Sequence, residues 1–123
     1  MVVDEKISEI LKDLRMTVKS ESALIKKDGN LVFSEFSFGF QADEIFGTMS
    51  ASIIGAAKKL TAECNKGFPK NIIIQTGNAH IILTNAGSTA LLMCMVDAMK
   101  ATDMILHEID RAADRIKEVL SNN

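Results

Sequence analysis

Residues 45–57 read IFGTMSASIIGAA and contain no charged side chain. A helix on the surface of a domain needs only one apolar stripe, about 100° wide, and turns polar groups to water elsewhere. Here one face repeats apolar residues at helical spacing, and a second face carries small ones. The first face consists of Phe46, Met49, Ile53, Ala57 and Leu60, and the second of Gly47, Ala51 and Gly55. We therefore expect a helix with two neighbours: the first face packs on the domain's own sheet, and the small residues of the second allow close approach of a helix from a partner chain.

Length and charge limit the class of protein. At 123 residues the chain predicts a single domain, residues 1–123, that buries about two-thirds of the surface exposed by its unfolded form. The formal net charge of −2 provides no field that would attract DNA or RNA. Polar side chains interrupt the longest uncharged stretch, residues 72–96, so no membrane span is expected.

The two cysteines, Cys64 and Cys94, form no C-x-x-C pair and lie among apolar residues. So few cysteines, with no apolar leader after Met1, favour a reducing, cytoplasmic compartment. A reactive thiolate needs a nearby cation or a helix start to lower its pKa. Both residues are therefore interpreted as small core side chains and not as nucleophiles.

Hydrophobic spacing and turn residues predict three helices and five strands. The helices begin near Val3, Asp43 and Thr102, and the second ends before Gly67 and Pro69. The five β-rich runs are residues 22–27, 31–36, 71–76, 79–84 and 89–96.

The expected fold is α+β with the order α-β-β-α-β-β-β-α. Tight turns between the runs predict an antiparallel sheet. Residues 72–74 and 91–96 do not alternate with polar residues, which is typical of strands covered on both faces. We therefore expect a five-stranded antiparallel sheet sandwiched by helices, with the middle helix on one face and the terminal helices on the other.

Three phenylalanines, Phe36, Phe38 and Phe40, follow the second predicted strand at alternating positions. If the strand continues, they line one side of it together. They then either cover the core beneath the terminal helices, which we favour for at least two of them, or form an exposed apolar patch typical of a binding site.

No residue pattern indicates catalysis or metal binding. His80 is interpreted as a packed strand residue and His107 as a solvated helix residue, since a zinc site needs three or four ligands at close spacing. The sequence has no G-x-S-x-G motif and no Gly-rich phosphate loop, and no nucleophile–base pair can be assembled. We expect no enzyme activity, no cofactor and no metal.

At this point the chain resembles the Roadblock family, which includes dynein light chains and MglB-like domains, and it does so over essentially its whole length. Besides the element order, the resemblance is carried by the Asp28-Gly29-Asn30 hairpin, ADEIFGTMSASIIGAAKKL at 42–60, GFPKNIIIQT at 67–76 and EIDRAADRIKEVL at 108–120. The fold implied is Roadblock/profilin-like. A short single-domain form is similar to the prokaryotic members.

The resemblance implies a homodimer, or a heterodimer with a paralogue. In this family the central helices pack antiparallel, and the edge strands that follow them join into one sheet. By position, the implied helix contacts are Ile45, Thr48, Ala51, Ser52, Gly55, Ala56 and Lys59. The implied strand contacts are Asn71, Ile72, Ile73, Ile74, Gln75 and Thr76. Gly47 joins this interface as a member of the small-residue face.

The resemblance also implies a non-enzymatic scaffold or regulator that binds a small Ras-like GTPase. An arginine that stabilises phosphate charge in trans is not expected, because Arg15, Arg111 and Arg115 all fall on the terminal helices. Any stimulation of hydrolysis would then come from holding the switch loops of the GTPase itself. The identity of the GTPase, and the choice between stimulation and tethering, stay open.

An alternative function is a small-molecule-sensing or adaptor module of a signalling or motility complex. A ligand pocket needs a few convergent polar groups among apolar ones. Only Thr76, His80 and Thr84 are candidates for that role.

Overall fold

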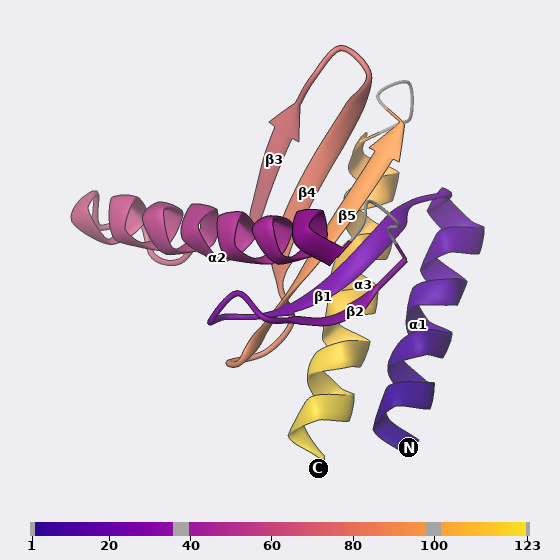
Figure 1. Ribbon diagram of the computed structural model, residues 1–123. Helices are drawn as coiled ribbons and strands as arrows, with labels where there is room; N and C mark the ends of the chain where they lie inside the picture. The colour runs from indigo at the N-terminus through magenta and orange to yellow at the C-terminus, as the bar shows by residue number, and fades with distance from the viewer. Residues whose placement is uncertain (1, 36–39, 98–101, 123) are drawn as a thin grey trace.

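The computed structural model of the protein describes residues 2–35, 40–97 and 102–122 (Figure 1). The elements in these residues follow the predicted order. They are α1 (Val2–Val18), β1 (Glu21–Lys26), β2 (Leu31–Ser34), α2 (Phe40–Glu63), β3 (Asn71–Gln75), β4 (Ala79–Asn85), β5 (Ala90–Asp97) and α3 (Thr102–Ser121). The predicted α+β class is thus confirmed.

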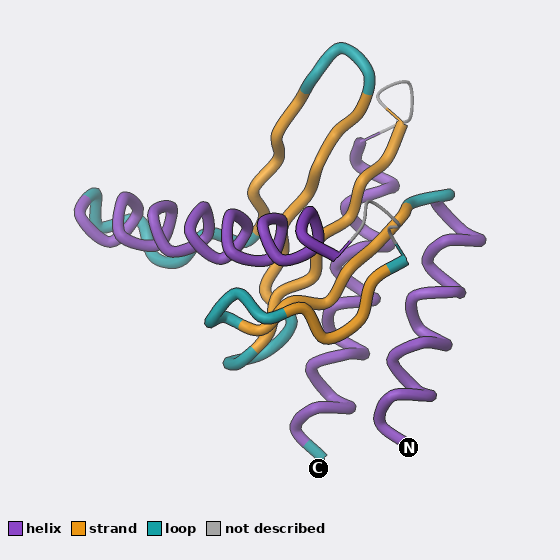
Figure 2. The backbone as a smooth tube through the Cα atoms, viewed as in Figure 1, coloured by secondary structure: helices purple, strands orange, loops and turns teal. Residues whose placement is uncertain are grey.

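The five strands form one antiparallel sheet in the spatial order β2-β1-β5-β4-β3. β5 lies at the centre, where Leu92 is paired with Leu24 of β1 and with Thr84 of β4. The chain leaves one edge of the sheet after β2, crosses it as α2, and returns at the opposite edge as β3. This crossover brings the end of α2 and an edge strand to the same side of the molecule (Figure 2).

Helices cover both faces of the sheet, as expected. α1 and α3 lie side by side on one face and bury side chains such as Leu11, Ile109 and Leu92. α2 lies on the other face, over Ile25 and Leu91. Consecutive residues of β5 therefore point into two different apolar layers, which explains its unbroken apolar sequence.

β3 differs from this expectation because it is an edge strand. Ile73 is exposed, and Ile72 and Ile74 are only half-buried. The prediction that residues 72–74 are covered on both faces is wrong for the single chain. The apolar run there belongs to a sheet edge that nothing in the described chain covers.

The bounds of α2 differ from the sequence prediction at both ends. The helix begins at Phe40, so Phe40 is helical and does not continue a strand, while Phe36 and Phe38 lie outside the described residues. At the other end the helix stops at Glu63, and Asn65 is the left-handed residue that ends it, with φ of 57°; Gly67, which was predicted to end it, also has a positive φ of 82° but lies two residues further on. The N–H groups of Asn65 and Lys66 donate to the carbonyls of Ala62 and Thr61, at 3.1 and 2.9 Å, which closes a Schellman motif.

Candidate protein–protein interface

The two halves of α2 have different environments. The sheet and its β1–β2 turn bury Gly47, Ser50 and Ile54, which lie in the part of α2 before residue 55. Residues 55–63, all of which the structure describes, contain no buried side chain. Figure 1 shows this second half continuing past the sheet on the side of β3. The helix is thus longer than its own domain can cover.

The face of α2 that contacts the sheet matches the predicted one only in part, because Phe46 and Ile53 pack against the same apolar cluster as Ile54. Ser50 donates a hydrogen bond from its Oγ to the Sδ of Met93 in β5, at 3.3 Å. A Cβ added to Gly47 would collide with the carbonyl oxygen of Gly29 in the β1–β2 turn. Gly47 is therefore buried by its own chain, and its small size does not serve a partner helix. This corrects its inclusion in the predicted interface.

The exposed face of α2 carries large apolar side chains. Ile45, Met49 and Leu60 are 57%, 56% and 66% exposed. The prediction that Met49 and Leu60 face the domain's own sheet is wrong. Exposed apolar side chains gathered on one helix are typical of an interaction site.

The remaining residues implied by the family resemblance lie along this same exposed side. Ala51 is half-buried at its border, and the exposed members are Thr48, Ser52, Gly55, Ala56 and Lys59. A Cβ at Gly55 would meet no atom within 4 Å. The fold of the single chain therefore gives no reason for a glycine there.

The free edge of β3 adjoins the overhanging end of α2. Among the described residues β3 pairs only with β4, so within them the other edge of the strand presents unpaired backbone groups. The side chain of Asn71 is held within the chain, with its Nδ2 donating to Thr84 Oγ1 at 2.7 Å and to Asp110 Oδ1 at 2.9 Å. Phe68, just before the strand, is 83% exposed. Helix face, loop and strand edge together form the candidate interface.

One basic pair borders this surface. Lys27 lies in the β1–β2 turn and Lys58 lies on α2. Burial, followed by the hydrogen bond and the positive charge of Lys58, lowers the pKa of Lys27 to about 8. The two ammonium groups are therefore close enough to repel each other where α2 crosses the hairpin.

The histidines and cysteines lie in different environments. His80 is half-buried in β4, and His107 is exposed on α3. Cys94 is buried, and burial raises the pKa of its thiol to about 12. Cys64 is exposed, which corrects its interpretation as a core residue. In the part of the chain that the structure describes, no three His, Cys, Asp or Glu side chains come together to hold a metal ion.

The polar residues that a ligand pocket would need do not converge. Thr84 Oγ1 accepts the hydrogen bond from Asn71, whereas Thr76 Oγ1 donates to the carbonyl of Ala79 and closes the β3–β4 turn. His80 stands opposite Gln75 in the strand ladder. The arrangement does not favour the small-molecule-sensing alternative.

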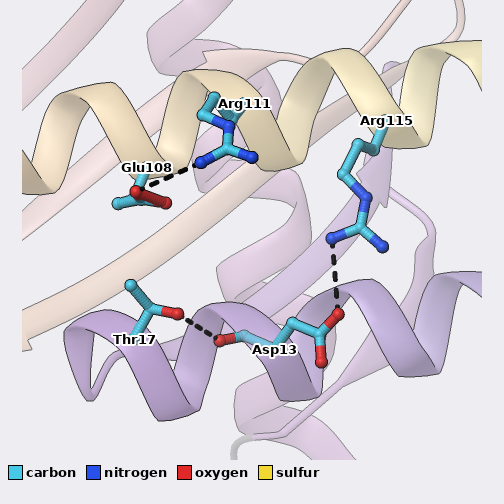
Figure 3. A network of polar contacts seen from close by, with 5 residues as sticks. All are labelled: Asp13, Thr17, Glu108, Arg111 and Arg115. Atoms are coloured by element: carbon cyan, nitrogen blue, oxygen red, sulfur yellow. Dashed lines mark hydrogen bonds and ion pairs between the residues drawn. The ribbon is translucent and has the colours of Figure 1, made fainter.

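The three arginines lie on the opposite side of the sheet from α2. Figure 3 shows Arg115 of α3 paired with Asp13 of α1 at 3.4 Å, and Arg111 paired with Glu108 at 3.5 Å. Arg15 lies 4.0 Å from the carboxylate of Glu35. These arginines belong to the terminal helices, on the face of the sheet away from α2, as the sequence predicted.

Comparison with known proteins identifies the family. The model of the Roadblock/LC7 domain matches residues 11–96. The chain belongs to the Roadblock/LC7 family. An uncharacterized protein of Methanocaldococcus jannaschii is 29% identical to this Roadblock/LC7 chain over 113 residues, which span 90% of this chain and 96% of the relative.

Two solved structures show the same fold as this Roadblock/LC7 protein. Myxococcus xanthus MglB is 17% identical and has a TM-score of 0.88, with 96% of this chain and 97% of that chain covered. A structure described as MglB with tetrameric arrangement is also 17% identical, with a TM-score of 0.89 and coverage of 99% and 93%. Within residues 2–35, 40–97 and 102–122, no helix combines the length and apolar character that crossing a bilayer requires.

Proposed function

We propose that this protein is a non-enzymatic scaffold or regulator that acts as a homodimer and binds a small Ras-like GTPase. The proposed dimerisation is supported by the exposed apolar side of α2, where Ile45, Met49 and Leu60 are each more than half exposed. Membership of the Roadblock/LC7 family supports a small Ras-like GTPase as the binding partner. We further propose that residues 1–123 act as one domain, in a reducing cytoplasm where the exposed Cys64 stays a free thiol.

In the proposed dimer, the α2 helices of two copies pack antiparallel and the β3 strands meet edge to edge. The helix contacts are Ile45, Thr48, Ala51, Ser52, Gly55, Ala56 and Lys59, and the strand contacts are residues 71–76. A specific dimer of this kind should bury about 1,600 Å² in total. The tetrameric arrangement described for one MglB structure fits a fold that assembles with copies of itself.

A charge placed on the proposed two-fold axis tests the dimer. Ser52 is exposed near the middle of the uncharged stretch, so we expect Ser52→Glu to leave the fold of one chain unaffected. In the dimer it brings two carboxylates together, and such a like-charge contact costs several kcal/mol. We expect the variant to sediment as a monomer at micromolar concentrations at which the native protein is dimeric.

Ser121→Glu is the matched control. Ser52 and Ser121 are both exposed helix serines whose Oγ donates to the carbonyl four residues earlier, at 3.0 and 2.8 Å. The Ser121 variant should dimerise like the native protein. A Ser52→Glu variant that dimerises equally well contradicts the helix-pair interface.

Direct binding tests the GTPase. Purified Ras-like GTPases from the same genome, loaded with GDP or with a non-hydrolysable GTP analogue, are titrated with the native dimer by calorimetry. We expect one of them to bind with an affinity that depends on the nucleotide. A panel in which no GTPase binds in either state contradicts this part of the proposal.

Hydrolysis assays then separate regulation from tethering. No arginine of the described residues lies on α2 or β3. If hydrolysis is stimulated, Arg15→Ala, Arg111→Ala and Arg115→Ala should therefore stimulate it to the native extent. A loss of stimulation with any of these three variants would show that an arginine acts in trans.

A further inference from the structure

The exposed side of α2 consists of two flanks with different chemistry. One flank carries a charge at each end and small residues between: Glu44, Thr48, Gly55 and Lys59. The other flank is apolar: Ile45, Met49, Ala56 and Leu60. All eight residues are exposed, and Ser52 lies between the flanks. Within each flank the spacing is four, seven and four, which keeps the four side chains in one row along the helix.

Each flank is self-complementary when it is read in the opposite direction. On the charged flank, reversal places Glu44 against Lys59 and Thr48 against Gly55. On the apolar flank, it places Ile45 against Leu60 and Met49 against Ala56. The midpoint of each flank along the sequence falls next to Ser52. A two-fold interface requires this property, because residue i of one copy meets residue j of the other and j meets i.

The shape of the helix surface fits the same pairing. A shallow hollow lies between Glu44, Ile45, Thr48 and Met49. In the reversed copy, the residues that face this hollow are Gly55, Ala56, Lys59 and Leu60. In that copy Gly55 and Ala56 are small and allow close approach of the two helices. Its Lys59 and Leu60 side chains are long and extend toward the ends of the hollow.

We infer that Glu44 and Lys59 form two symmetric ion pairs between copies of this chain and thereby fix the antiparallel register of the α2 helices. This inference rests on the proposed dimer. Neither side chain makes an ion pair with any residue of its own chain that the structure describes. Fifteen positions separate them, about 22 Å along the helix, so they cannot pair with each other within one chain. A parallel arrangement would bring like charges together.

Charge reversal at the two positions provides the test. Glu44→Lys creates two lysine–lysine contacts in a homodimer, and Lys59→Glu creates two glutamate–glutamate contacts. We expect the dissociation constant of each single variant, measured by sedimentation equilibrium at low salt, to rise about tenfold or more. Mixing the two variants restores both attractions, so the mixture should form a heterodimer with nearly native affinity.

Matched charge reversals on the opposite layer serve as controls. Lys12→Glu on α1 and Glu118→Lys on α3 change exposed side chains by the same charges and should leave the dissociation constant unchanged, alone and mixed. If the native protein dimerises but both α2 variants dimerise equally well, or if their mixture does not recover affinity, the register is wrong and the dimer stands. If the native protein is a monomer at millimolar concentration, the proposed dimer itself fails.

Discussion

The carbonyl oxygen of Gly29 occupies the space in which a side chain of residue 47 would begin. Gly29 lies at the β1–β2 turn with φ of 98°, a conformation that favours glycine. A Cβ on Gly29 would in turn lie 3.2 Å from the Cα of Thr48. Two backbones therefore meet without intervening side chains, and this contact seats α2 on the sheet.

Gly47→Ala should destabilise the protein. Alanine improves helix propensity by about 1 kcal/mol, but its methyl group overlaps the Gly29 carbonyl, and overpacking of this kind costs typically 1–3 kcal/mol or more. We expect a net loss of about 1–2 kcal/mol in the free energy of unfolding, measured with urea at a protein concentration that keeps every variant monomeric. Gly55→Ala is the control, since its methyl group meets nothing and should stabilise the monomer. Equal stability of both variants would exclude the close contact.

Replacement of Asn65 by glycine should destabilise the protein less than its replacement by alanine. The residue ends α2 in the left-handed region, which costs an ordinary L-residue roughly 1–2 kcal/mol. Asn65→Ala should therefore lower the melting temperature, whereas Asn65→Gly should leave it unchanged or raise it. Lys66 has no positive φ, so its glycine variant should not have a higher melting temperature than its alanine variant. An alanine variant as stable as the glycine variant would contradict the helix end described above.

A thiol reagent should label one of the two cysteines in the native protein. Cys64 is exposed, whereas Cys94 is buried with a pKa raised to about 12 by that burial. At pH 8 we expect Ellman's reagent to react with one thiol per chain, and with two after denaturation. The Cys64→Ser variant should not react until it is unfolded. Rapid labelling of Cys94 in that variant would show that the centre of the sheet opens.

Stability should depend on the ionisation of Glu35. The side chain of Glu35 is 8% exposed, and burial raises its pKa above the ordinary value of 4.5, although the Ser22 N–H donates to its carboxylate at 3.0 Å. A raised pKa in the folded state means that the protonated form is favoured by folding. The contribution of Glu35 to stability is therefore full below pH 4.5 and is lost as the pH rises through the folded-state pKa.

Glu35→Gln tests this pH dependence. Glutamine keeps an acceptor for Ser22 but cannot ionise, so the variant should be more stable than the native protein at pH 7. The difference between the two proteins should shrink as the pH falls through the folded-state pKa of Glu35 and should be lost below pH 4.5, because Glu35 is then protonated in both the folded and the unfolded state and the other carboxyl groups titrate equally in both proteins. Urea unfolding at several pH values measures it. A difference that widens on acidification would contradict burial as the dominant effect.

The sequence by itself determined the elements, their order and the class of the fold. Helical spacing marked α1 and α3, and Asp28-Gly29 marked the β1–β2 turn, because these signals depend on residues only a few positions apart. The apolar run of β5 likewise indicated a strand between two layers. The same local reading identified α2 as the helix with an uncharged outer side.

The tertiary structure alone decided which side of α2 is the outer one. Both sides of the helix are uncharged, so hydrophobic spacing could not rank them, and Gly47 was assigned to the partner while Met49 and Leu60 were assigned to the core. The choice depends on the approach of Gly29, which is close in space and eighteen positions away in sequence. The strand order, which leaves one edge of β3 free, also depends on contacts between segments that are distant in sequence. Contacts between distant segments set both features, and no local pattern encodes them.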